Sequence, residues 1–119
     1  MGKIFLENIS LFGFHGCMKE EAKVGTFFRV DLEVDTDLSK AAMTDELLDV
    51  VNYIHLNRIV KEEMAIRSKL LEHVAQRIIR RIRKELPVVH RVKIKVCKLF
   101  PPLDGDVGKV CVIMKDGEG

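Results

Sequence analysis

Residues 28–35 alternate between apolar and charged side chains, and this run constrains the fold more than any other part of the sequence. The apolar positions are Phe28, Val30, Leu32 and Val34, and the charged positions are Arg29, Asp31, Glu33 and Asp35. Because successive side chains of a β-strand point to opposite faces of a sheet, this period of two predicts a strand with one buried and one polar face. The chain is therefore expected to contain a sheet that is covered on one side only.

Three further segments are predicted to be strands. Residues 92–97 place apolar side chains at the even positions, between Lys93, Lys95 and Cys97. Residues 4–14 are rich in apolar and aromatic side chains and end among glycines, and residues 110–114 carry apolar side chains at every second position. Such runs, bounded by glycine and proline, are typical of strands.

Two helices are predicted between the second and third strands, over residues 52–64 and 68–86. Apolar residues recur there at spacings of three and four, which places them on one side of a helix. Ser68 is the predicted N-cap of the second helix, and Pro87 ends it. The apolar stripes are Leu56, Ile59, Val60 and Met64 in the first helix, and Leu71, Val74, Ala75, Ile78, Ile82 and Leu86 in the second.

The order of these elements predicts an α+β fold of the form ββααββ, with a four-stranded antiparallel sheet and both helices packed on one face. On the uncovered face, Asp31 and Glu33 of one strand would share the surface with Lys93 and Lys95 of another, where opposite charges attract modestly. A sheet of this kind has two unpaired edges, which are commonly closed by assembly. A barrel made from several subunits would close them.

Length and composition indicate one soluble domain over residues 1–119. With 119 residues the chain is long enough for a single core, and 47% hydrophobic with 32% charged residues is an ordinary globular balance. Lysine and arginine exceed aspartate and glutamate by only 20 to 18, so the charge does not indicate a nucleic-acid partner. Lys3 precedes any apolar stretch long enough for a signal or membrane segment, so a cytoplasmic location without membrane attachment is expected.

The cysteines and histidines predict neither a disulfide nor a metal site. Cys17, Cys97 and Cys111 are widely spaced and form no C-x-x-C pair, so we expect reduced and mostly buried thiols. The four histidines form no H-x-H or H-E-x-x-H motif, which argues against zinc. No cofactor is expected.

Lys98 is a candidate acid/base residue because it continues the even-numbered apolar phase of residues 92–96. Its side chain is therefore predicted to point towards the covered face as its strand ends. Partial desolvation there would lower the lysine pKa towards neutrality, as a general acid or base requires. The alternative is a strand-end lysine that reaches water.

Three more positions have side chains suited to chemistry. Glu72 lies one turn into the second helix, near the positive end of the helix dipole, and could accept two parallel hydrogen bonds or be a surface residue. Tyr53, the single tyrosine, could donate a proton or pack as a ring. Glu20 and Glu21 belong to a polar loop over residues 17–26 and could bind a polyol or remain solvated.

Seven segments, in order and at matching spacing, resemble the dihydroneopterin aldolase family over nearly the whole chain. They are residues 12–16, Glu21 with Gly25, residues 37–42, residues 44–45, residues 51–53, residues 70–75, and Lys98 ahead of Pro101 and Pro102. The resemblance implies the tunnelling fold, in which subunits join their sheets into a barrel. It also implies a homo-octamer of two stacked tetrameric rings, with active sites between neighbouring subunits.

The same resemblance implies a reaction and a set of site residues. Enzymes of this family split 7,8-dihydroneopterin into 6-hydroxymethyl-7,8-dihydropterin and glycolaldehyde by a retro-aldol reaction, without metal or Schiff base, in tetrahydrofolate synthesis. Glu72 matches the pterin anchor, assisted by the backbone of Leu71, and Lys98 with Glu21 matches the acid/base pair. Tyr53 matches a substrate-binding tyrosine that helps to protonate the intermediate from the adjacent subunit.

Two departures and two alternatives accompany the resemblance. The segment 99–108 is shorter than in many relatives, and Phe14 stands where many have tyrosine.

The nearest alternative is an epimerase of dihydroneopterin or its triphosphate, because cleavage followed by re-addition inverts the hydroxyl-bearing carbon. The alternative from another class is a non-catalytic nucleic-acid or protein-binding module, supported by the basic run in residues 77–84.

Overall fold

The computed structural model describes residues 1–117, so the last two residues of the predicted domain lie outside the described part. Its larger elements confirm the predicted order of two strands, two helices and two strands. In chain order they are β1 (Gly2–Gly13), α1 (Lys19–Val24), β2 (Thr26–Thr36), α2 (Ser39–Thr44), the 3-10 helix η1 (Leu47–Asp49), α3 (Tyr53–Met64), α4 (Leu71–Glu85), β3 (Arg91–Leu99) and β4 (Lys109–Gly117).

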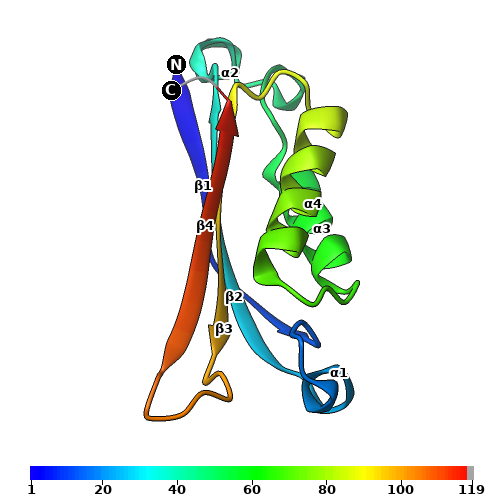
Figure 1. Ribbon diagram of the computed structural model, residues 1–119. Helices are drawn as coiled ribbons and strands as arrows, with labels where there is room; N and C mark the ends of the chain where they lie inside the picture. The colour runs from blue at the N-terminus through cyan, green and yellow to red at the C-terminus, as the bar shows by residue number, and fades with distance from the viewer. Residues whose placement is uncertain (118–119) are drawn as a thin grey trace.

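The four strands form one antiparallel sheet in the order β1-β2-β3-β4, and α3 and α4 cover one of its faces (Figure 1). The short helices α1, α2 and η1 were not predicted. The polar loop predicted over residues 17–26 contains α1, a helix of six residues that ends before Gly25. Figure 1 shows α1 at one end of the sheet, and α2 with the start of β1 and the end of β4 at the other.

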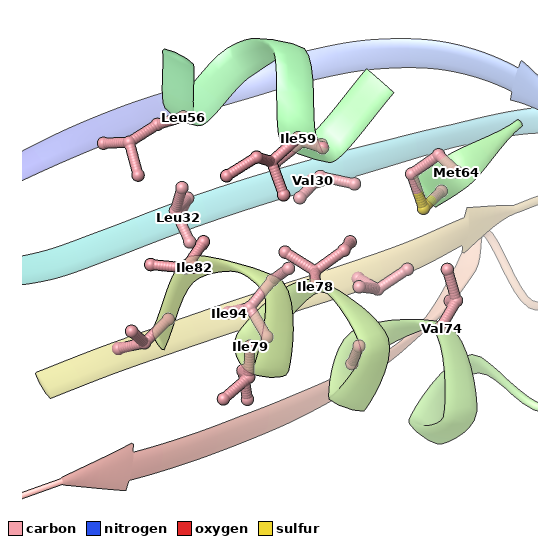
Figure 2. Packing of buried hydrophobic residues seen from close by; sticks show 14 of the residues in the cluster. Val30, Leu32, Leu56, Ile59, Met64, Val74, Ile78, Ile79, Ile82 and Ile94 are labelled. Carbon is pink, nitrogen blue, oxygen red and sulfur yellow. The ribbon is translucent and has the colours of Figure 1, made fainter. Parts of the chain in front are cut away.

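The core lies between the sheet and the two long helices. Side chains of α3 and α4 pack on the even-numbered side chains of β2 and β3, as Figure 2 shows for Ile59, Ile78, Val30, Leu32 and Ile94. These five residues are at most 1% exposed, and each fully buried side chain of this size stabilises the fold by roughly 1.5–3 kcal/mol. Within residues 1–117, no helix is both long enough and apolar enough to cross a bilayer.

The starts of the two long helices differ from each other. Asn52 caps α3, since its side-chain Oδ1 accepts a hydrogen bond from the Ile54 N–H at 2.9 Å. The prediction that Ser68 caps the second helix is wrong, because α4 begins at Leu71 after Leu70. Ser68 is instead buried, and its hydroxyl contacts His73 at 2.8 Å and accepts a hydrogen bond from Arg77 at 2.9 Å.

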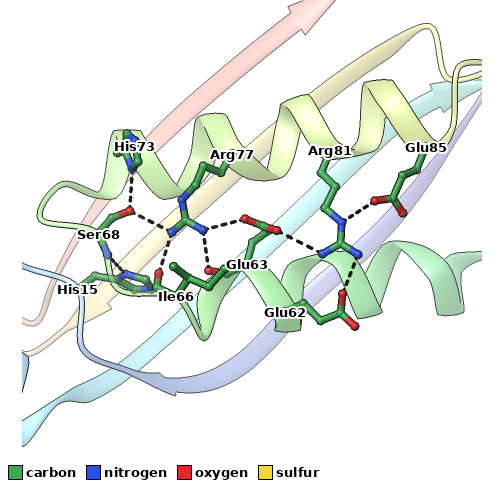
Figure 3. A network of polar contacts seen from close by, with 9 residues as sticks. All are labelled: His15, Glu62, Glu63, Ile66, Ser68, His73, Arg77, Arg81 and Glu85. Carbon is green, nitrogen blue, oxygen red and sulfur yellow. Dashed lines mark hydrogen bonds and ion pairs between the residues drawn. The ribbon is translucent and has the colours of Figure 1, made fainter.

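Helices α3 and α4 run antiparallel and are joined by ion pairs along their length (Figure 3). Arg77 pairs with Glu63 at 2.7 Å, and Arg81 pairs with Glu62 at 2.6 Å. Glu85 contacts His55 at 2.7 Å. Two arginines of the basic run are therefore already paired with carboxylates, which weakens the nucleic-acid alternative.

The uncovered face carries the charges that the alternation predicted. Asp31 lies opposite Lys95 and Glu33 opposite Lys93 in the register of β2 and β3. The ion pairs that form on this face come from Lys3 of β1, which contacts Glu33 at 3.0 Å and Asp35 at 2.8 Å. Among the described strands, β1 and β4 each pair on one side only and are the edges of the sheet.

The prediction of reduced cysteines is wrong for two of the three. Cys97 of β3 and Cys111 of β4 lie directly opposite each other and form a disulfide with an S–S distance of 2.07 Å. Cys17 is a free thiol, but it is exposed rather than buried. The bond joins the two ends of the connection between β3 and β4, directly beside Lys98.

Candidate active site

Lys98 lies at the end of β3 on the covered side of the sheet, as its even-numbered phase predicted. The residue is only 8% exposed, which is unusual for a lysine. Its Nζ donates a hydrogen bond to Oε2 of Glu21 at 2.5 Å, so the buried ammonium is paired with a carboxylate. Strand β3 therefore places the Lys98 side chain in a partly buried ion pair with Glu21.

Glu21 reaches this pair from α1, and its second carboxylate oxygen accepts the backbone N–H of Met18 at 3.2 Å. Burial opposes the charge of Glu21, but the hydrogen bonds from Lys98 and from the Met18 N–H outweigh burial and lower the pKa of the carboxyl group. These hydrogen bonds thus favour the ionised form of Glu21 beside Lys98. A proton that leaves or enters this pair can move between two groups in direct contact.

Gly16 makes room for the Glu21 carboxylate. Its φ is 149°, a conformation that favours glycine, and a Cβ at this position would overlap the carboxylate atoms of Glu21. Gly25 ends α1 with a φ of 73°, where a Cβ would meet the ring of Phe12 and the backbone of Gly13. Two glycines of the matching segments, Gly16 and Gly25, therefore have a packing reason.

A pocket of about 250 Å³ opens beside this pair and has Glu21 in its wall. Its other lining residues come from two parts of the chain, residues 15–26 and the connection after β3: His15, Met18, Glu20, Val24, Gly25, Thr26, Phe100 and Pro102. The wall is mainly apolar with a few polar groups, the usual character of a small-molecule site. The connection 100–108 contributes to this wall although it is short.

Glu72 and Leu71 lie at the start of α4, at the same end of the molecule as the ion pair. Glu72 is exposed in the first turn of the helix, whereas Leu71 is 8% exposed. The first backbone N–H groups of a helix have no partner within it, so this terminus offers N–H donors beside a carboxylate acceptor. The loop before Leu71 is hydrogen-bonded to the segment that leads into α1, as when Gly16 N donates to Ser68 O at 3.0 Å.

Tyr53 lies at the other end of the helix pair. It is the first residue of α3 and is 64% exposed. Since α3 and α4 are antiparallel and His55 contacts Glu85, Tyr53 lies near the end of α4 rather than near Glu72 at its start. At 1.5 Å per residue the separation along α4 is roughly 20 Å. One chain thus brings Glu21 and Lys98 together but leaves Tyr53 apart.

His15 and Arg67 were not assigned a role from the sequence, yet both contact the segment that carries the site. His15 is 1% exposed, and its Nδ1 accepts the Ser68 N–H at 3.0 Å. Arg67 donates to the carbonyl oxygens of Phe14 and Gly16. The available signal was that His15 directly precedes a glycine in one of the matching segments.

Within residues 1–117, no three His, Cys, Asp or Glu side chains are grouped to hold a metal ion.

A four-stranded antiparallel sheet covered on one face by two helices, with a partly buried lysine–carboxylate pair beside an open pocket, defines a protein of the tunnelling fold with a candidate small-molecule site. The family model for dihydroneopterin aldolase matches residues 4–115. The chain belongs to the dihydroneopterin aldolase family. Its reaction is the retro-aldol cleavage of 7,8-dihydroneopterin in tetrahydrofolate synthesis.

Individual relatives agree with this assignment. The dihydroneopterin aldolase of Bacillus subtilis is 35% identical over 113 residues, which cover 94% of each chain. That of Streptococcus pyogenes serotype M1 is 36% identical over 109 residues, covering 88% of this chain and 89% of its own. The crystal structure of E. coli dihydroneopterin aldolase in complex with neopterin superimposes with a TM-score of 0.90 at 24% identity, covering 98% of this chain and 100% of that one.

Proposed function

We propose that Lys98 and Glu21 form the acid/base pair of this aldolase, that Glu72 and the backbone of Leu71 bind the pterin ring, and that Tyr53 enters the site from a neighbouring subunit. The observation that carries the proposal is the buried contact between Lys98 and Glu21 at 2.5 Å beside an open pocket. The roles of the other residues follow the family resemblance and the chemistry of their positions.

The reaction breaks the carbon–carbon bond between the two hydroxyl-bearing side-chain carbons next to the ring. A base takes the proton of the hydroxyl on the outer carbon, which becomes the aldehyde carbon of glycolaldehyde. The electron pair of the broken bond moves to the imine nitrogen of the dihydropterin ring. The resulting enol-like intermediate gains a proton on the inner carbon and becomes 6-hydroxymethyl-7,8-dihydropterin. The Lys98–Glu21 pair suits the proton transfers because its two members are in direct hydrogen-bond contact at 2.5 Å.

Glu72 suits the binding of the pterin ring. The amino group and ring N–H on one edge of a pterin form two parallel donors, which a carboxylate accepts as a pair. The positive end of the α4 dipole favours the ionised form of Glu72. A backbone N–H at the start of the helix, such as that of Leu71, adds a donor for a ring acceptor. These contacts would orient the side chain of the substrate towards Lys98.

A homo-oligomer is part of the proposal, because Tyr53 is too far from Lys98 within one chain. The edges β1 and β4 are available to pair between copies, with acidic residues on β2 and basic residues on β3. Pairing β4 of one copy with β1 of the next would bring basic and acidic halves of the uncovered faces together. We infer four copies to a barrel and two barrels to an octamer, as the family resemblance implies.

We further propose that the reaction needs neither a metal nor a Schiff base. The ring imine already serves as the electron sink, so no lysine imine is needed for that purpose. Lys98 Nζ is hydrogen-bonded to the Glu21 carboxylate rather than free to attack a carbonyl. The cytoplasmic location remains a prediction of the sequence.

The test is to incubate chelator-treated protein with 7,8-dihydroneopterin and to follow pterin and glycolaldehyde by chromatography, with and without borohydride. Formation of both products, undiminished by chelator and without borohydride inactivation, is expected. Inactivation by borohydride only in the presence of substrate would point to a Schiff base. Recovery of activity only on adding a divalent metal would overturn metal independence, and epimer as the sole product would favour the epimerase.

A further inference from the structure

The segment 14–17, which leads into α1 and Glu21, is fastened to the loop 66–70, which leads into Leu71 and Glu72. Ser68 and His15 form the centre of this contact (Figure 3). The Ser68 N–H donates to His15 Nδ1 at 3.0 Å, and the Ser68 carbonyl accepts the Gly16 N–H at 3.0 Å. Both side chains are buried, with exposures of 1% for His15 and 6% for Ser68.

Two arginines fix the same contact from either side. Arg67 donates to the carbonyl of Phe14 at 3.1 Å and to that of Gly16 at 2.6 Å. Arg77 donates to Ser68 Oγ at 2.9 Å and to the Ile66 carbonyl at 2.7 Å (Figure 3). Hydrogen bonds from charged donors are stronger than neutral ones, so the two segments are held in one arrangement.

The contact has consequences for both halves of the site. Gly16 lies so close to Glu21 that a Cβ at position 16 would overlap the Glu21 carboxylate. A shift of Gly16 would therefore change the position that the carboxylate can occupy. On the other side, Ser68 lies three residues before Leu71, where α4 begins. A change in the contact would therefore alter the position of the proposed pterin anchor relative to the acid/base pair.

We propose that His15 is a positioning residue for the aldolase reaction, which sets the distance between the Glu21–Lys98 pair and Glu72 by accepting the Ser68 N–H through Nδ1. This inference rests on the proposed roles of Glu21, Lys98 and Glu72. His15 also lies in the wall of the pocket, but this role acts through Nδ1 and Ser68 and requires no contact with the substrate. Misplacement of reacting groups by about 1 Å costs on the order of 10²-fold in rate, so a positioning role of this kind is measurable.

The role requires neutral His15. Nδ1 accepts a hydrogen bond, so a proton on that nitrogen would face the Ser68 N–H and break the contact. Burial lowers the pKa of His15, a weaker interaction with the Met64 carbonyl opposes this lowering, and the charges of Arg77, Lys98 and Arg67 add to it. The Ser68 hydroxyl contacts two further titratable groups, His73 at 2.8 Å and Arg77 at 2.9 Å.

The experiment compares His15→Leu with His15→Asn, because asparagine places an acceptor oxygen near the position of Nδ1 whereas leucine fills the space without one. His15→Leu is expected to lower kcat by about 10²-fold and to leave the Kd of neopterin within about threefold. His15→Asn should recover most of kcat. The exposed residue Arg67 offers a second test, since Arg67→Met keeps the core intact and should show the same separation of kcat from binding. His90→Leu, which changes an exposed histidine next to β3, is the matched control.

Hydrogen exchange provides a readout that does not depend on turnover. In His15→Leu the amide N–H groups of Gly16 and Ser68 should lose protection together, while those in the middle of β2 keep theirs. If wild-type protein failed to cleave dihydroneopterin, the proposed function would fail, yet this exchange pattern would still decide whether His15 couples the two segments. Unchanged protection, or a folded His15→Leu variant with wild-type kcat, would overturn the inference. An equal loss of kcat and of neopterin binding without recovery in His15→Asn would overturn it as well.

Discussion

Lys98 Nζ and Glu21 Oε2 are 2.5 Å apart although the two residues are 77 positions apart in the sequence. The contact joins the end of β3 to the short helix α1 and leaves the lysine side chain 10% and the glutamate side chain 14% exposed. Since an isolated charge is costly to bury, each residue makes the burial of the other possible. Changing either one therefore affects both stability and chemistry.

Lys98→Met should abolish most turnover while pterin binding is kept. Removing a general acid/base group costs typically 10²–10⁴-fold in rate, and Lys98 is not part of the proposed ring contacts. The variant also leaves Glu21 buried without its cation, which should lower the free energy of unfolding by roughly 2 kcal/mol. Steady-state kinetics measures turnover and neopterin titration measures binding, both well below the melting temperature. Lys95→Met, on the uncovered face, is the control and should keep kcat; a large loss of neopterin binding in Lys98→Met would contradict the assigned role.

The ion pair should also make stability depend on pH in the acid range. The folded-state pKa of Glu21 lies below its ordinary value of 4.5, so the carboxylate contributes stability that is complete above pH 4.5 and is lost as the pH falls through the folded pKa. Urea unfolding of wild type and Glu21→Gln between neutral pH and about pH 3 measures this contribution. The difference in unfolding free energy between wild type and Glu21→Gln should be constant at higher pH and shrink below pH 4.5. A difference that grows on acidification would show that Glu21 is destabilised by its surroundings.

Glu72→Gln should act mainly on binding. The change removes one acceptor and the negative charge that two pterin donors require, and a charge-assisted hydrogen bond is worth about 1.5–3 kcal/mol, so the Kd of neopterin should rise on the order of tenfold to a hundredfold. Calorimetric titration measures this directly. Glu62→Gln, an exposed carboxylate of α3 that pairs with Arg81, is the control and should bind normally. A fall in kcat with unchanged Kd in Glu72→Gln would move Glu72 from anchoring to catalysis.

The sequence predicted those parts of the fold that follow from local periodicity. The period of two around Val30 and Val96 identified the covered strands, and the same phase placed Lys98 on the covered side. Ser68 was misassigned because a serine before an apolar stripe is a common helix N-cap, whereas here its position was decided by tertiary contacts with His73 and Arg77.

The contacts that were missed depend on how distant segments meet. The pairing of Cys97 with Cys111 follows from the register of β3 and β4, which depends on the length of the connection between them and not on the composition of either strand. The partnership of Glu21 with Lys98 was supplied by family resemblance, because no local pattern links a short helix to a strand 77 positions later. Apart from its place before Gly16 in a matching segment, His15 carried no signal of its contacts, since its partner Ser68 lies 53 positions away.

Reduction of the Cys97–Cys111 disulfide should destabilise the protein. The bond spans 14 positions, and closing a loop of about 15 residues restricts the unfolded chain by about 3 kcal/mol in the chain-entropy description. Urea unfolding with and without a thiol reductant measures the change, and a Cys97→Ser, Cys111→Ser double variant should resemble the reduced protein and be insensitive to reductant. Cys17→Ser is the control, since its thiol is free. Equal stability in both redox states would mean that the bond does not form in solution.

Mixing two inactive variants should restore activity if each site combines residues of two subunits. Tyr53 lies about 20 Å from the start of α4 along the helix pair, so a site containing Tyr53 and Lys98 must draw them from different copies. Tyr53→Phe subunits supply an intact Lys98, and Lys98→Met subunits supply an intact Tyr53. When equal amounts are unfolded together and refolded into closed rings, about a quarter of the sites receive both intact residues. Formation of 6-hydroxymethyl-7,8-dihydropterin should rise accordingly above the level of either variant alone. A mixture that is no more active than the average of the two separately refolded variants would show that Tyr53 and Lys98 do not act in a shared site.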